Sequence, residues 1–218
     1  MIQPMGVARE HMEVRKGISV GAILLAAGQA RRMGESGLHK LLAEFEGVPL
    51  VRRSAAVLLA SSATPVVVVT GHRRGDVEQA LTGLDIDTVF NLSYAAGMAS
   101  SVACGISHPQ IAKCDGFLLM LADMPDIMTD HIDSVVHAFR QSGGEAIVRA
   151  SFRDKPGHPV LFPKALYKGL IELKGDIGAR DLIVDSKLPV VTIDIGPAAL
   201  ADVDTPTAII EKGGVLRT

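Results

Sequence analysis

Short apolar runs alternate along the chain with segments whose apolar residues recur at helical spacing. The apolar runs predict β-strands at residues 22–27, 65–70, 86–91, 117–122, 146–151 and 189–194. The helical spacing predicts α-helices at residues 49–61, 76–81, 97–106 and 128–141. Strands and helices that alternate in this order are typical of a mostly parallel sheet covered by helices. The predicted fold class is therefore α/β, with three layers and helices on both faces of the sheet.

The alternation becomes irregular after residue 152. The segment KPGHPVLFP, residues 155–163, contains three prolines, and KGDIGARDL, residues 174–182, contains two glycines. We expect this part of the chain to contribute the second half of a binding site. Residues 1–19 lack the apolar centre of a secretory signal, so we expect a weakly ordered N-terminal extension followed by one domain at residues 20–218.

Composition excludes several classes of partner. The 22 basic residues are balanced by 24 acidic residues, so no overall field favours nucleic acid or an anionic membrane. Aromatic residues make up 4% of the chain and Trp is absent, which argues against stacking platforms for single-stranded nucleic acid. No apolar run approaches the ~18 residues of a spanning helix. The only two cysteines, Cys104 and Cys114, favour a reducing, cytoplasmic location.

The stretch from residue 20 to residue 42 has the pattern of a phosphate-binding loop. A buried strand is followed by Gly28 and then by Arg31, Arg32 and Lys40. Glycine lets backbone N–H groups approach an anion, and the cations supply charge-assisted donors to phosphate oxygens. Neither GxxxxGK[ST] nor GxGxxG follows the strand, so the P-loop and the dinucleotide-binding fingerprint are both absent. A strand, a turn and a solvated basic helix end remain an alternative interpretation.

Carboxylates follow two later segments of the chain. Asp123 ends the most apolar strand in the sequence DMP, and Asp204 lies in DVDTP near the C-terminus. Ligands of open α/β sheets bind beyond the carboxyl ends of the strands, and Mg²⁺ is commonly held there by one or two carboxylates and by substrate phosphates. Each motif also has a local interpretation, with Asp123 in an Asx turn and Asp204 as the N-cap of a final helix.

The segments LAAGQARRMG and KLL together resemble the signature of the MobA-like nucleotidyltransferases. The form LAAG looks most like the MocA branch, the molybdenum cofactor cytidylyltransferases, and the resemblance extends from residue 21 to residue 209. It implies a Rossmann-like sheet, catalytic Arg32, Lys40 and Asp123, and Mg²⁺ bound by Asp123 and Asp204. The residues that it implies for nucleotide binding are Leu25, Ala26, Ala27, Gly28, Arg32, Lys40, Thr70, Gly71, Gly97, Met98, Ser100 and Ser101. The sequence ESGLH before Lys40 departs from the proline or asparagine that is common in the family.

Three further segments are similar to motifs of the same family. GMASSV, residues 97–102, resembles the segment beside the nucleoside, and either Ser100 or Ser101 is expected to cap the following helix. GHPVLF and GDIGAR resemble the acceptor-side loop and a second anionic clamp. The residues that they imply for acceptor binding are Gly157, His158, Asp176 and Arg180. A Gly-His-Pro turn with a solvated imidazole is the alternative for His158.

The resemblance implies transfer of CMP from CTP to molybdopterin, with release of pyrophosphate. It also implies a molybdoenzyme or its chaperone as a partner. The methyl group of Ala27 is expected to project where the base lies and so to favour CTP over GTP. Two other functions remain open: an oxidoreductase of a heterocyclic pigment, similar to nicotine blue oxidoreductase, and a non-catalytic carrier of molybdopterin or nucleotide. The missing GxGxxG disfavours the former, and the pair Asp123 and Asp204 disfavours the latter.

Overall fold

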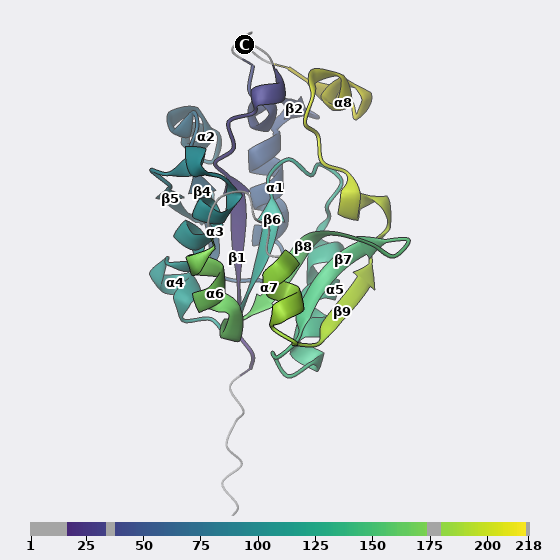
Figure 1. Cartoon of the computed structure of the whole chain (residues 1–218). Coiled ribbons are helices and arrows are strands. Elements are labelled where there is room, and N and C mark those ends of the chain that lie inside the picture. Colours follow the sequence, from purple (N-terminus) through teal and green to yellow (C-terminus); the bar gives the residue numbers. More distant parts are fainter. Residues whose placement is uncertain (1–16, 34–37, 174–179, 217–218) are drawn as a thin grey trace, which may run out of the picture.

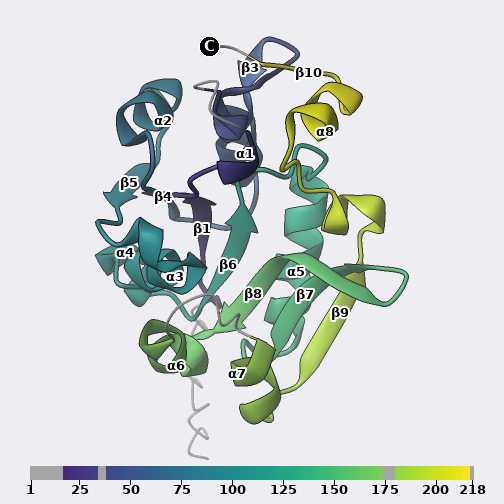
Figure 2. The ribbon, with the colours of Figure 1, turned by 45° about the horizontal axis from the view of Figure 1, so that its top comes forward.

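The computed structural model describes residues 17–33, 38–173 and 180–216. It has a seven-stranded mixed sheet in the order β5-β4-β1-β6-β8-β7-β9, covered by helices on both faces, and a small sheet in the order β10-β2-β3 (Figures 1 and 2). The predicted fold class is confirmed. No helix within the described ranges has the length and apolar character needed to cross a membrane.

The strands are β1 (Val20–Ala26), β2 (Glu44–Phe45), β3 (Val48–Pro49), β4 (Val66–Thr70), β5 (Asp87–Phe90), β6 (Gly116–Leu121), β7 (Ile147–Phe152), β8 (Lys155–Pro163), β9 (Val190–Asp194) and β10 (Gly214–Val215). The α-helices are α1 (Leu50–Leu59), α2 (Arg74–Ala80), α3 (Met98–Ile106), α4 (Pro109–Ala112), α5 (Thr129–Gln141), α6 (Tyr167–Glu172), α7 (Arg180–Asp185) and α8 (Pro206–Glu211). The 3-10 helices are η1 (Arg31–Met33), η2 (Lys40–Leu42), η3 (Tyr94–Ala96), η4 (Lys164–Leu166) and η5 (Gly196–Leu200).

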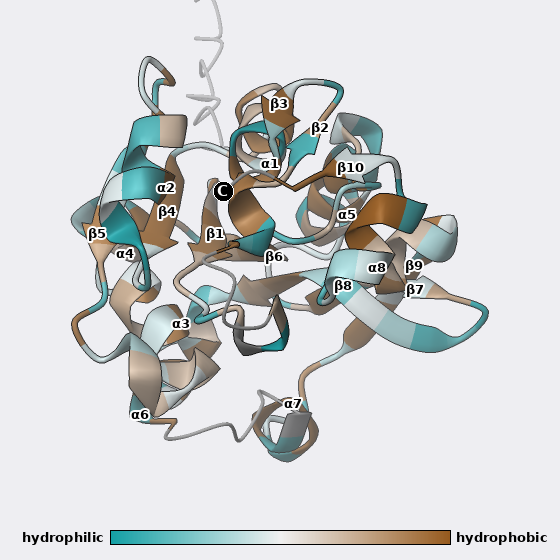
Figure 3. Ribbon diagram, turned by 90° about the horizontal axis from the view of Figure 1, so that it is seen from above, coloured by the Kyte–Doolittle hydropathy of each residue, from teal (hydrophilic) through white to brown (hydrophobic). Residues whose placement is uncertain are grey.

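Strand β1 shows why the sheet is buried on both faces. Its alternate residues Ala22 and Leu24 belong to a core cluster that includes side chains of α1 and α5. The intervening Ile23 belongs to a second cluster with side chains of α3 and α6. Because successive side chains of a strand point to opposite faces, one apolar run supplies two helix–sheet interfaces. Figure 3 shows hydrophobic residues along β1 and β4 between the helices.

Strand β8 is a central strand of the large sheet that the sequence pattern failed to predict. It lies between β6 and β7 and is antiparallel to both, so the sheet is mixed rather than wholly parallel. Its prolines argued against a central strand, because proline cannot donate to a ladder. The structure resolves this conflict at Pro159, where the pairing with β6 ends at Val160 and the register with β7 shifts. Pro159 therefore occupies a position at which neither neighbouring ladder is continuous.

A small third hydrophobic cluster packs the segment after β1 against the last segment of the chain. Met33, Ala43 and Phe45 from the first loop pack with Val203 and Ile209 from the last segment. The small sheet reinforces this contact, since β10 pairs with β2. Lys40 lies within the first of these segments and Asp204 immediately follows Val203, so this packing brings residues of opposite charge to the same edge of the sheet.

Candidate active site

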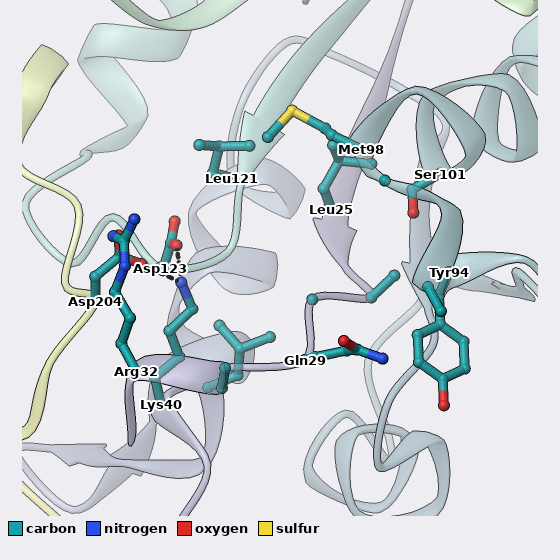
Figure 4. A pocket seen from close by; sticks show the side chains of 16 residues that line it. Leu25, Gln29, Arg32, Lys40, Tyr94, Met98, Ser101, Leu121, Asp123 and Asp204 are labelled. Carbon is teal, nitrogen blue, oxygen red and sulfur yellow. Dashed lines mark hydrogen bonds and ion pairs between the residues drawn. The ribbon is translucent and has the colours of Figure 1, made fainter. Parts of the chain in front are cut away.

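A pocket of about 400 Å³ opens at the carboxyl ends of β1 and β6, beside the beginning of α3. Figure 4 shows its charged residues on one side and Tyr94, Met98 and Ser101 on the other, with Gln29 between them. The pocket is lined by Leu25, Ala27, Gly28, Gln29, Ala30, Arg32, Lys40, Leu41, Tyr94, Ala95, Gly97, Met98, Ser101, Leu121, Asp123 and Asp204.

The ammonium group of Lys40 lies between two carboxylates. Its Nζ atom is 2.5 Å from Oδ2 of Asp123 and 2.7 Å from Oδ1 of Asp204. Arg32 donates through Nη1 to the other oxygen of Asp204 (Figure 4). The Lys40 and Asp123 side chains are 14% and 12% exposed, whereas Arg32 is 72% exposed. Lys40 and Asp123 are thus sheltered from solvent, and Arg32 is the exposed member of this ion cluster.

Backbone hydrogen bonds bring the three segments of this cluster together. The N–H of Ala122 donates to the carbonyl of Leu25 over 3.1 Å, which places the end of β6 against the end of β1. We call the segment that follows β1 and includes Arg32 and Lys40 the signature loop. The N–H of Val203 donates to the carbonyl of Asp123 over 2.9 Å. Since Asp204 is the next residue, this bond brings the two carboxylates to the same ammonium.

The cluster favours the charged forms of Lys40 and Asp204. Burial alone would lower the pKa of Lys40, but Asp123 and Asp204 together outweigh burial and raise it. The hydrogen bond from Lys40 lowers the pKa of Asp204 against the effect of burial, and the charge of Arg32 adds to this. Lys40 and Asp204 therefore keep opposite charges at neutral pH.

The local interpretations of the two aspartates do not match the structure. The N-cap of α8 is Thr205, whose side chain accepts from the N–H of Ala208, so Asp204 is free for other contacts. The side chain of Asp123 accepts a hydrogen bond from the distant Lys40. Both carboxylates point into the pocket rather than completing a turn or a helix end (Figure 4).

The carboxylates fit the requirements of a magnesium site. Oδ1 of Asp123 is buried and has no hydrogen-bond partner among the described residues, and Asp204 supplies further carboxylate oxygens beside it. Hard oxygen ligands of this kind suit Mg²⁺. Within the described ranges, no group of three or more His, Cys, Asp or Glu side chains could hold a metal. A cation here would therefore depend on ligand phosphates for the rest of its coordination.

The residues predicted for nucleotide binding divide into two groups. Leu25, Ala27, Gly28, Arg32, Lys40, Gly97, Met98 and Ser101 line the pocket. The other four, Ala26, Thr70, Gly71 and Ser100, do not line it. Ala26 and Thr70 are fully buried, and a methyl group at Gly71 would lie 2.6 Å from the carbonyl oxygen of Ala27. Ala26, Thr70 and Gly71 thus pack beneath the loop that begins at Ala27 and do not face the pocket.

The prediction that Ser100 or Ser101 caps α3 is wrong. The N-cap is Gly97, with φ of 108°, and it makes no side-chain capping bond. Ser100 donates to the carbonyls of Ser93 and Gly97, and both Ser100 and Ser101 accept from the side chain of Asn91. The serines hold the turn before the helix, and they leave the first N–H groups of α3 without a side-chain cap.

The expected role of the Ala27 methyl group also changes. Ala27 is only 4% exposed, and a methyl group at Gly71 would lie 2.8 Å from its Cβ atom. The methyl group therefore faces Gly71, and little of its surface is available to exclude a purine base.

The predicted acceptor residues Gly157 and His158 do not line the pocket. A methyl group at Gly157 would lie 2.0 Å from the carbonyl oxygen of Ala199, so packing requires glycine there. His158 is half-buried, and burial lowers its pKa although the charges of Asp123 and Asp202 oppose this. The imidazole is therefore uncharged at neutral pH, and His158 lies half-buried in β8 rather than solvated in a turn. Asp176 lies outside the described residues, and Arg180 begins α7.

Several pocket residues were missed by the sequence analysis. The residues that line the pocket without having been singled out are Gln29, Ala30, Leu41, Tyr94, Ala95 and Leu121. Gln29, Ala30 and Leu41 lie within the motifs LAAGQARRMG and KLL, whereas Tyr94 and Ala95 lie outside the quoted motifs. Tyr94 had the clearest available signal, because the chain contains only two tyrosines and this one stands just before GMASSV.

Comparison with known proteins shows the family to which this chain belongs. The model of the family described as "MobA-like NTP transferase domain" matches residues 22–190. The chain belongs to this family. The purine catabolism protein PucB of Bacillus subtilis is 27% identical over 84% of this chain and 91% of its own length. The bifunctional protein GlmU of Pelobacter propionicus is 29% identical over 64% of this chain, but the match spans only 30% of GlmU.

Solved structures share the fold of this MobA-like domain. A nucleotidyl transferase of Methanothermobacter, Mth528, has a TM-score of 0.75 at 22% identity, covering 90% of this chain and 96% of its own. Rv0371c of Mycobacterium tuberculosis in complex with manganese has a TM-score of 0.69 at 22% identity, covering 88% and 97%. CMP:2-keto-3-deoxy-manno-octonic acid synthetase in complex with CTP has a TM-score of 0.71 at 12% identity, covering 89% and 96%.

Replacing Lys40 by methionine should strengthen divalent metal binding in the absence of nucleotide. The ammonium neutralises both carboxylates, and like charges a few ångströms apart repel strongly in a partly buried site, so we expect Mn²⁺ to bind at least about 10-fold more tightly. Calorimetry or electron paramagnetic resonance measures this affinity. The matched control is Lys212→Met, which removes the partner of Asp126 outside the pocket. Unchanged or weaker Mn²⁺ binding in Lys40→Met would contradict the expectation that the Lys40 ammonium and the metal compete for the same two carboxylates.

Proposed function

We propose that the protein is a magnesium-dependent nucleotidyltransferase that moves CMP from CTP to a phosphorylated acceptor of the molybdopterin type. An oxygen of the acceptor phosphate attacks the α-phosphorus of CTP, the bond from this phosphorus to the oxygen bridging the β-phosphorus breaks, and pyrophosphate leaves with the electron pair. The observation that carries this proposal is the cluster of Lys40, Asp123, Asp204 and Arg32 at one end of the pocket.

The side chains have separate roles in this reaction. Arg32 is largely exposed, so it is free to turn toward the β- and γ-phosphates, and Lys40 neutralises charge that develops on the leaving pyrophosphate. Asp123 and Asp204 would hold Mg²⁺, and the bound cation would neutralise phosphate charge. Preorganised charges and positioning supply most of the rate, because phosphoryl chemistry of this kind needs little covalent help from the protein.

The nucleoside is proposed to occupy the other side of the pocket. Leu25, Tyr94 and Met98 offer apolar surface there, and Ser101 offers a hydroxyl group. The uncapped beginning of α3 adds backbone N–H donors beside Gly97. This division leaves the phosphates facing the cations and the base facing the mostly apolar wall.

The family assignment supports nucleotidyl transfer, and the similar structures solved with CTP and with manganese support a pyrimidine nucleotide and a divalent metal. The molybdopterin acceptor rests on the MocA-like signature. We assign the acceptor side to His158 and Arg180, with Asp176 between them in sequence and Gly157 as a packing residue. A molybdoenzyme or its chaperone is the proposed recipient of the product.

The remaining proposals concern organisation and location. We propose that residues 20–218 act as one catalytic domain, since the site combines residues from the first loop with Asp204 near the C-terminus. A cytoplasmic location is consistent with both cysteines, Cys104 and Cys114, being free thiols.

Replacement of Asp123 by asparagine tests the proposed activity. Pyrophosphate release is measured with CTP, Mg²⁺ and molybdopterin, and we expect the variant to lose about 10²- to 10³-fold in kcat because one fixed charge is removed from the cation site. Asp126→Asn is the matched control, since Asp126 is nearby in sequence but lies outside the pocket.

The outcomes separate the alternatives. Pyrophosphate release by the native protein that disappears in Asp123→Asn and persists in Asp126→Asn supports the proposal. Binding of CTP and molybdopterin without pyrophosphate release would instead identify a carrier. Normal turnover by Asp123→Asn in excess Mg²⁺ would remove Asp123 from the metal site.

Nucleotide choice provides a second test. We expect kcat/KM for CTP to exceed that for GTP by about 10- to 200-fold, the range that pocket contacts of this size provide. Because the methyl group of Ala27 is buried against Gly71, we expect the Ala27→Gly variant to keep most of the preference for CTP over GTP. Parallel assays with one acceptor measure both ratios. Equal specificity constants for CTP and GTP would leave a nucleotidyltransferase without base preference.

A further inference from the structure

Two stacked imidazole rings, of which that of His39 is buried and that of His72 half-buried, connect Lys40 to the opposite wall of the pocket. His39, the residue before Lys40, is 2% exposed and stacks on His72 with ring centroids 5.6 Å apart and planes 22° apart. His72 in turn lies against Tyr94, with centroids 6.3 Å apart and planes tilted by 54°. We call His39, His72 and Tyr94 the aromatic column.

The aromatic column lies close to the signature loop. The N–H of His72 donates to the carbonyl of Ala27 over 3.2 Å. A methyl group at Gly71 would lie 2.7 Å from Cβ of Tyr94, so there is no space between this strand end and the tyrosine. The carbonyl of Gly28 lies near the ring of His39 without a hydrogen bond of ordinary geometry. Movement of any member therefore disturbs the loop that carries the phosphate-binding residues.

Stability alone does not explain the two histidines. Neither ring nitrogen of His39 has a hydrogen-bond partner among the described residues, and Nδ1 of His72 is also without one. Buried polar atoms of this kind destabilise a fold, and an apolar side chain would fill the same space without that cost. Burial, together with the nearby His72 and Arg73, lowers the pKa of His39 to about 4, so its ring is neutral beside Lys40.

We propose that His39 is a positioning residue for the proposed nucleotidyl transfer: stacked through His72 on Tyr94, it fixes the distance between the Lys40 ammonium and the nucleoside wall. The inference rests on the proposed function for its catalytic consequence only. A flat ring at position 39 holds the backbone of Lys40 from one side, and Tyr94 receives the same support at the other end of the column. Nucleoside and phosphates of one ligand must contact both ends at once, so this distance affects the rate of transfer.

The first test needs no ligand. The chain has no Trp and only two Tyr, so Tyr167→Phe leaves Tyr94 as the single fluorescent residue of this class. In that background we expect His39→Ala to increase the quenching of Tyr94 by acrylamide, and His39→Phe to preserve the protection. Ile132→Ala, a buried change in the opposite core layer, is the control for general loosening. Quenching of Tyr94 that is unchanged in His39→Ala, or raised equally by Ile132→Ala, would overturn the proposal.

The second test uses kinetics. We expect His39→Ala to lower kcat by about 10- to 100-fold, the scale of a small misplacement of a reacting group, and His39→Phe to keep most of the activity. In the Lys40→Met background, His39→Ala should lower kcat by far less, because the group that it positions is missing. An equal loss in both backgrounds would mean that His39 acts otherwise than through Lys40. Native protein without pyrophosphate release would refute the proposed function, while the quenching result would still decide the structural connection.

Discussion

The shared contact of Lys40 with Asp123 and Asp204 is the interaction on which the pocket depends. It joins the signature loop, the end of the central strand and the last segment of the chain, which are far apart in sequence. Burying an ammonium and a carboxylate costs free energy that their attraction offsets only when geometry is good. Removing either partner would leave an uncompensated charge in a sheltered site, so the three side chains act as one unit. The same two carboxylates are the oxygen ligands that a cation would need.

The scaffold places these charges by ordinary packing. Parallel strands β1 and β6 end at the same edge, so residues that follow them are neighbours. The backbone bond from Val203 to Asp123 then sets the position of Asp204, and the small cluster around Phe45 keeps the first loop close. The charged residues are thus held by apolar contacts and backbone hydrogen bonds outside the pocket. This arrangement leaves the cluster free to exchange partners when a charged ligand arrives.

The sequence could predict the parallel half of the fold because its signals are local. An apolar run such as 117–122 is typical of a doubly covered strand whatever its neighbours are. Strand β8 could not be predicted, since Pro159 is acceptable in a central strand only where the pairing of β8 with both of its neighbours, β6 and β7, is interrupted. Among the site residues, the motif spacing identified the four charged residues that the structure brings together, although their roles remain predictions. It could not show that Lys40 bridges the carboxylates, or that His39, His72 and Tyr94 form a column, because these contacts depend on tertiary packing.

We expect Lys40 to give up the two carboxylates to a metal when nucleotide binds. The most direct measurement is a crystal structure of the protein with Mg²⁺ and a non-hydrolysable CTP analogue. We expect Mg²⁺ at about 2.0–2.1 Å from oxygens of Asp123 and Asp204, with the Lys40 ammonium moved onto the phosphates. A bound nucleotide with Lys40 still between the two carboxylates and the metal held elsewhere would contradict this expectation.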